Sequence, residues 1–149
     1  MSNVLQILIE QASEKADKAA KSMAVTQQKM AQARDKLNML QTYRDECESG
    51  LQNKAVTGLT GQQLRNQLAF VGKIAEAISQ QKRELDFLDT TLQHQRKQWQ
   101  DALGEQRKYE ALVEREKLKK ARLENKRDQK MNDEFAARIY RVHTAGETT

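Results

Sequence analysis

Three side chains in this sequence could act as nucleophiles, proton carriers or metal ligands: Cys47, His94 and His143. The two histidines lie far apart along the chain, and His94 stands in a polar run, which favours solvated or structural histidines over a catalytic pair. The sequence contains no phosphate-binding glycine loop, no CxxC pair and no HExxH motif. We therefore predict no enzyme activity, no cofactor and no bound metal, and we look for function in surfaces.

The most unusual surface belongs to residues 114–142, EREKLKKARLENKRDQKMNDEFAARIYRV. Its residue types favour a helix, but it has almost no apolar stripe. Basic residues recur there at helical spacing, namely Arg115, Lys119, Arg122 and Lys126. Two interpretations stay open. The segment is either a solvated helix held by i,i+4 pairs such as Glu116 with Lys120, or a surface that binds a partner.

Composition shows what kind of framework must position these residues. The chain has 149 residues, no proline, 5% aromatic and 32% charged residues, which is typical of a coiled coil. One cysteine excludes a disulfide scaffold. The N-terminus does not resemble a signal peptide, and no apolar run approaches the roughly 20 residues of a membrane helix. We therefore expect a soluble, cytoplasmic protein without direct membrane insertion.

Apolar residues repeat with alternating spacings of three and four along two segments, which predicts a coiled-coil seam. The first segment contributes Leu5, Ile9, Ala12, Ala16, Ala19, Met23, Thr26, Met30, Ala33, Leu37, Leu40, Arg44, Cys47 and Leu51. The second contributes Leu64, Gln67, Val71, Ile74, Ile78, Gln81, Leu85, Leu88, Leu92, Gln95, Trp99, Ala102, Gln106, Tyr109 and Val113. Cys47 fits this seam as a small apolar residue.

A glycine-rich break at residues 50–61 separates the two segments, and Thr60 with Gln63 fits a capping box that restarts a helix. We therefore predict an all-α fold, a long antiparallel two-helix coiled-coil hairpin with an extended C-terminal helix. It forms one domain over residues 1–149. The expected parts are a helix over about 3–54, a turn over about 55–60, a helix over about 61–140 and a frayed tail over 141–149.

This register makes specific pairs. Leu51 lies near Leu64, Trp99 faces Ala16 and Ala19, and Leu103 faces Ala12, so that large residues meet small ones. In this register, the start of the first helix pairs with about residue 112 of the second helix. The apolar seam of the second helix also ends after Val113. The second helix then continues as an unpaired arm, residues 114–139.

The register also brings two exposed aromatic residues, Tyr43 and Phe70, to the same level outside the seam, near Met39 and Ala77. Exposed aromatics in a chain this poor in them indicate a contact patch, although they could equally widen the seam. In the arm, Phe135, Ile139 and Tyr140 form an i,i+4,i+5 apolar edge that could anchor in a partner's groove.

At ENKRDQKMNDEFAAR, residues 124–138, the sequence resembles the flagellar export protein family FliJ. The start, VLQILIEQASEKADKAA, and the tract LNMLQTYRDE at residues 37–46 extend this resemblance over nearly the whole chain. The chain departs from the family pattern at Lys36, Cys47 and Gln81.

The resemblance implies an antiparallel coiled coil like the central stalk of rotary ATPases, acting in the flagellar type III export apparatus. Three partners are implied. They are the export ATPase hexamer, whose assembly and activity the chain would promote, the cytoplasmic domain of the export-gate membrane protein, and export chaperones. The protein would sit peripherally at the inner membrane at the flagellar base, and would be a monomeric hairpin when free.

The resemblance also implies which residues bind these partners. Export-gate binding maps onto Leu40, Tyr43, Phe70, Ile74 and Ala77. For the ATPase ring, the arm offers Arg115, Lys119, Arg122, Lys126, Asp128, Gln129 and Phe135. Leu40 and Ile74 are also predicted seam residues.

Two other functions are compatible with a coiled coil of this composition. One is a generic structural coiled coil that dimerises along its length. The other is a nucleic-acid binder that uses the basic arm, but the net charge of only +5 speaks against it because nucleic-acid-binding domains are usually basic along one face.

Overall fold

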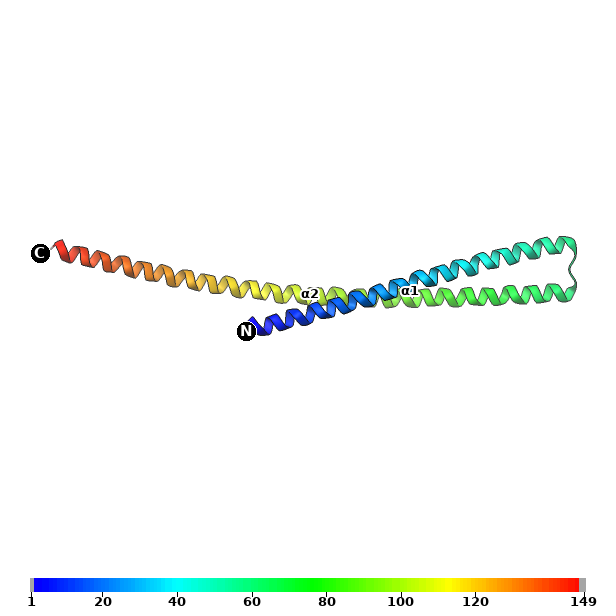
Figure 1. Ribbon diagram of the computed structural model, residues 1–149, viewed down its shortest axis with the longest axis horizontal. Helices are drawn as coiled ribbons and strands as arrows, with labels where there is room; N and C mark the ends of the chain where they lie inside the picture. Colours follow the sequence, from blue (N-terminus) through cyan, green and yellow to red (C-terminus); the bar gives the residue numbers. More distant parts are fainter. Residues whose placement is uncertain (1, 148–149) are drawn as a thin grey trace. The chain divides into compact units, whose positions relative to one another are not determined.

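The computed structural model describes residues 2–147, and these form two long α-helices with no strand among them. Helix α1 spans Ser2–Thr57 and helix α2 spans Gly61–Glu147 (Figure 1). Both helices are longer than expected. The segment 141–149, expected as a frayed tail, is helical through Glu147, and residues 148 and 149 lie outside the described residues. The all-α coiled-coil class is confirmed.

The connection between the helices consists of residues 58–60 alone. Helix α1 stops at Gly58, whose φ of 97° is the left-handed conformation that commonly ends helices and that glycine adopts without steric cost. Helix α2 begins with the predicted capping box. The Gln63 N–H donates to Thr60 Oγ1 and the Thr60 N–H donates to Gln63 Oε1, each at 3.2 Å. Gly50, which we assigned to the break, lies inside α1.

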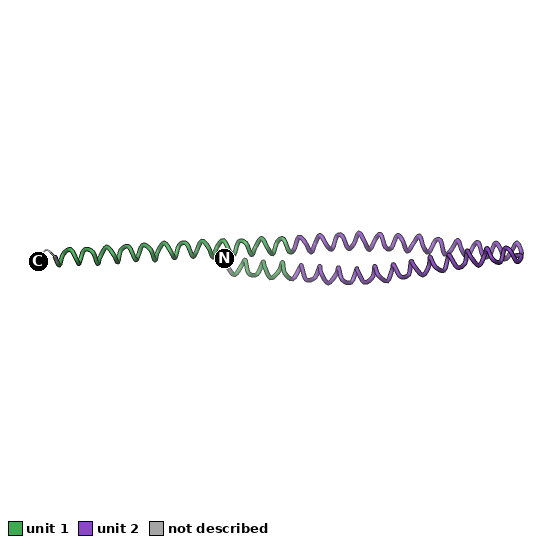
Figure 2. Tube along the Cα trace, turned by 90° about the horizontal axis from the view of Figure 1, so that it is seen from above, with its two compact units in different colours: residues 1–13, 103–149 green, residues 14–102 purple. Residues whose placement is uncertain are grey.

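The chain divides into two compact units, and the single domain over residues 1–149 stays a prediction. Unit 1 contains residues 1–13 and 103–149, and unit 2 contains residues 14–102 (Figure 2). In unit 2, the two helices run antiparallel on either side of the connection (Figures 1 and 2). Its best-packed cluster consists of Met30 and Ala33 from α1 with Leu88 and Leu92 from α2.

The predicted seam is confirmed by burial in unit 2. Every seam position of α1 from Ala16 to Leu51 is buried or half-buried, and so is every seam position of α2 from Gln67 to Ala102. Leu64 is the exception, with 40% of its surface exposed. Gln81 confirms the antiparallel register because its Nε2–H donates across the seam to the Ala33 carbonyl, at 3.0 Å. Ala16 and Ala19 are buried and Trp99 is half-buried, so their direct contact stays a prediction.

In unit 1, the seam continues through Leu5, Ile9 and the buried Ala12, and on α2 through Val113. A shallow apolar groove follows, with Val4, Leu5 and Leu112 in its lining. Every residue from 114 to 146 is exposed. The seam therefore ends where we predicted, and the arm is a helix without a buried face.

Candidate functional site

The first candidate surface lies in unit 2, near the connection. The rings of Tyr43 on α1 and Phe70 on α2 meet edge to face, with centroids 5.9 Å apart and planes at 85°. This is a favourable arrangement for two aromatic quadrupoles. The predicted shared level of the two residues is thus confirmed. The two residues remain 47% and 46% exposed, so the pair both spans the helices and presents an apolar surface. Met39, beside it in the register, is 72% exposed.

The other residues assigned to export-gate binding lie deeper. Ile74 is buried at 6% exposure, whereas Leu40 and Ala77 are half-buried. Leu40 and Ala77 line one groove of about 570 Å³ together with Lys36 and Gln81. The structure thus makes Tyr43 and Phe70 the accessible part of this set, and Ile74 a seam residue beneath it.

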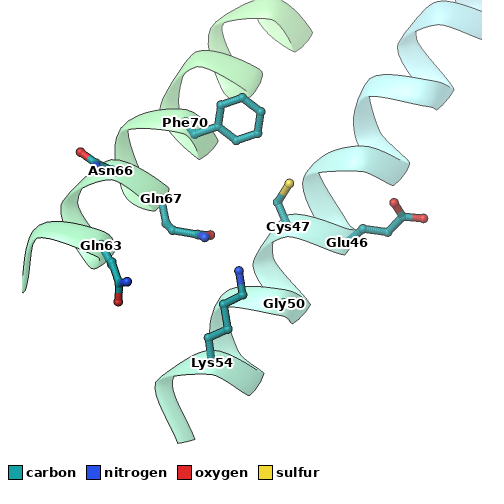
Figure 3. A pocket seen from close by; sticks show the side chains of 8 residues that line it. All are labelled: Glu46, Cys47, Gly50, Lys54, Gln63, Asn66, Gln67 and Phe70. Atoms are coloured by element: carbon teal, nitrogen blue, oxygen red, sulfur yellow. The ribbon is translucent and has the colours of Figure 1, made fainter. Parts of the chain in front are cut away.

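A pocket of about 550 Å³ adjoins the aromatic pair on the side toward the connection. Figure 3 shows Phe70 and Gln67 of α2 pointing toward Cys47 of α1, with Lys54 reaching up from the last turns of α1. The hollow exists because Cys47 and Gly50 are small, and a Cβ built on Gly50 would meet nothing within 4 Å. The pocket gives the apolar patch a neighbouring polar wall of amides, one ammonium group and the Glu46 carboxylate.

The second candidate surface is the arm of unit 1. All seven residues assigned to the ATPase ring are exposed along one helix: Arg115, Lys119, Arg122, Lys126, Asp128, Gln129 and Phe135. Within the described part of α2, the ion pair on the arm joins Lys117 to Glu114, at 3.9 Å. It replaces the expected pair of Glu116 with Lys120. At over two-thirds exposure of both side chains, such a pair contributes little stability.

The apolar edge at the end of the arm is wider than the sequence analysis recognised. Phe135, Ile139 and Tyr140 are 65%, 55% and 71% exposed. Met131 and Val142, at 66% and 74%, share a helical face with Phe135 and Ile139 because their spacings are four, four and three. Extending the Phe135–Ile139 spacing four residues back and three residues forward along the sequence would have shown this stripe.

Val25 and Phe87 were also missed by the sequence analysis. Both lie one position before a seam residue, are 53% and 67% exposed, and line the same groove. The signal available in the sequence was an apolar residue beside a polar seam position, Thr26.

Among the described residues, no group of three or more His, Cys, Asp or Glu side chains could hold a metal ion. Across the same residues, neither helix has a stretch both long and apolar enough to span a membrane. Cys47 is a free, half-buried thiol.

Comparison with known proteins agrees with this architecture. The family model described as flagellar FliJ protein matches residues 1–145. The flagellar FliJ protein of Escherichia coli K12 is 26% identical over 134 residues, which cover 90% of this chain and 91% of that one. The Salmonella typhi protein of the same name is 27% identical over the same coverage.

One solved structure shares the fold. It is described as that of a YscO homologue from Chlamydia trachomatis, and it superposes with a TM-score of 0.65 over 95% of this chain and 92% of the other. Sequence identity is 15%, so this likeness bears on the fold alone.

Proposed function

Because the chain belongs to the flagellar FliJ protein family, we propose that it is a non-catalytic stalk and adaptor of flagellar type III export. In this proposal, the arm engages the hexameric export ATPase and promotes its assembly and turnover. The Tyr43–Phe70 pair contacts the cytoplasmic domain of the export gate. The protein also handles export chaperones, and these contacts hold it at the inner membrane at the flagellar base.

The observation that carries the proposal is the exposure of the whole arm. A helix of this length gains little from intrinsic propensity, and most helices in proteins are stabilised by packing a face. Here no residue from 114 to 146 is buried, while the seam up to Val113 is covered. A stretch that keeps helical sequence without an internal partner is best explained by an external one.

The arm's composition supports a ring lumen lined by mixed charge as that partner. Its basic residues are exposed along the helix and could meet acidic loops. Exposed ion pairs of this kind steer association and give modest affinity that falls with salt. The apolar stripe that includes Phe135 and Ile139 could add a smaller anchored contact.

The test is ATP turnover by the cognate flagellar export ATPase, alone and with this chain. We expect stimulation by the full chain, and its loss in a version cut after Val113. A full-length variant with Arg115→Glu, Lys119→Glu, Arg122→Glu and Lys126→Glu should lose most of the stimulation and bind at least about tenfold more weakly.

The matched control reverses charges outside the arm, with Lys82→Glu and Lys97→Glu, both exposed in unit 2. This variant should stimulate like the natural chain. Equal stimulation by the natural chain and the cut version would reject the arm as the ring-binding element. Absence of stimulation by the full chain would reject the stalk proposal itself.

A further inference from the structure

A second groove in unit 2 combines exposed apolar and basic residues away from the Tyr43–Phe70 pair. It encloses about 400 Å³ and is lined by Lys21, Val25 and Lys29 of α1 and by Phe87, Thr91 and Gln95 of α2. Phe87 and Val25 are 67% and 53% exposed. Apolar area removed from water favours association, so a partner that covered these side chains would gain binding energy.

The seam beside this groove includes two polar residues, although buried Leu88 also lines it. Seam positions should be apolar and their outer neighbours polar. Here the seam holds Thr26, buried at 5%, and Gln95, whose Oε1 is buried without a hydrogen-bond donor among the described residues. The apolar residues Val25 and Phe87 stand outside. The helix pair therefore leaves Val25 and Phe87 where only a further element could bury them.

The charge of the groove specifies part of the partner's chemistry. Of the described residues lining it, two are lysines, Lys21 and Lys29, and none is acidic. The neighbouring groove shares Lys29 and Leu88 with it, and adds Lys36 on α1 opposite Glu84 on α2. Lysines thus follow the α1 edge of both grooves, and carboxylates on a partner would complement that edge.

The backbone chemistry of the groove specifies the partner's conformation. An extended peptide needs backbone hydrogen bonds from its binding site, but the walls of this groove are two helices whose backbone groups bond within each helix. A helix satisfies its own backbone and can pack its side chains into the space between two others. From Lys21 to Lys36, the basic edge extends roughly 22 Å at 1.5 Å per residue, or about four helical turns.

We propose that this groove is a docking site for a partner's amphipathic helix, with an apolar stripe that covers Val25 and Phe87 and a row of carboxylates that faces Lys21, Lys29 and Lys36. It is a third binding surface, distinct from the arm and from the Tyr43–Phe70 pair. At Lys36, its basic edge reaches the groove that Leu40 and Ala77 line. Failure of the ATPase test would leave it untouched.

The test uses the full-length chain and two synthetic helical peptides of about 18 residues as probes. The peptides share one leucine stripe at i,i+3,i+4,i+7 spacing, but one carries glutamates along its edge and the other lysines. Fluorescence anisotropy measures the Kd of each. We expect the glutamate peptide to bind, more weakly as salt rises, and the lysine peptide to bind at least about tenfold more weakly.

Variants then locate the site. Phe87→Ala and Lys29→Glu should each weaken binding of the glutamate peptide by about tenfold. Phe135→Ala and Lys97→Glu are matched controls, because Phe135 is 65% exposed in the arm and Lys97 is exposed on α2. Neither control should change the Kd, and neither should Tyr43→Ala. Circular dichroism should show the same helix content for all variants.

Four outcomes would overturn the proposal. Equal binding of both peptides would mean that apolar adhesion alone acts. A Kd for the glutamate peptide that is unaffected by Phe87→Ala and Lys29→Glu, or no binding, would show that this groove is not the site. If sedimentation shows a dimer that Phe87→Ala converts to monomer, the occupant is a second copy of this chain rather than a partner's helix.

Discussion

Tyr43 and Phe70 join the two helices of unit 2 through an edge-to-face ring contact at 5.9 Å, although nearly half of each residue remains exposed. Residues of this kind can serve stability and recognition together. Their contact is worth only about 0.5–1.5 kcal/mol beyond area burial. The exposed ring faces are large, and aromatic residues dominate binding energy at interfaces.

Replacing Phe70 with Ala should therefore separate the two roles. We expect binding to the cytoplasmic domain of the export gate to weaken by at least about tenfold. The free energy of unfolding should fall by only about 1 kcal/mol, since the ring is half in solvent. Calorimetric titration and urea denaturation measure these two quantities. Leu68→Ala is the control, because Leu68 lies on the same helix and is 53% exposed. A loss of affinity as large for Leu68→Ala would show that the ring pair is not the contact.

Gly50 lies inside α1 and Gly58 follows its end. Replacing each with alanine should change the free energy of unfolding in opposite directions. At Gly58, with φ of 97°, a Cβ is strained, and Gly58→Ala should lower the free energy of unfolding by about 1–2 kcal/mol. At Gly50, inside the helix with open space for a Cβ, Gly50→Ala should raise it by about 0.5–1 kcal/mol. Urea denaturation of the two variants provides the comparison. If both variants changed the free energy of unfolding in the same direction, the connection at residues 58–60 would not be formed as described.

The arm should be the least protected helix segment of the free protein. Its residues have no buried face. A helix without a buried face is stabilised only by intrinsic propensity and local side-chain pairs. Hydrogen exchange read by mass spectrometry should show rapid exchange across 114–139 and slow exchange around Met30 and Leu88. Adding the export ATPase should slow exchange in the arm. Strong protection of the arm in the isolated protein would contradict this expectation.

The seam was the most predictable part of the fold. Spacing alone located nearly every covered position, because a two-helix interface leaves room for little besides the a and d residues. The capping box was equally readable, since Thr60 and Gln63 satisfy each other within one turn. The end of α1 was less predictable from the sequence. Gly50 suggested a break, but one glycine inside a long packed helix costs too little to stop it.

The candidate surfaces were only partly predictable. The exposed placement of Tyr43 and Phe70 followed from register, because both stand off the seam at one level. The groove at Val25 and Phe87 did not emerge, because each residue by itself reads as an ordinary exposed apolar side chain. Thr26 stands in the predicted seam, but the spacings do not show that Val25 and Phe87 line one groove from the two helices. Burial of a residue depends on both helices at once, whereas a heptad pattern describes one.

The three-residue connection at 58–60 has a kinetic consequence for unit 2. Contacts near it, such as Tyr43 with Phe70, close a shorter loop than Ala33 with Gln81, whose residues are 48 positions apart. Loop closure costs about 0.6 kcal/mol more for each doubling of loop length. The preference for forming contacts near the connection first is therefore slight for any one contact, but it is the same along the whole of unit 2. We therefore expect the helices to come together first beside the turn and to zip outward, so that local pairing sets the folding rate.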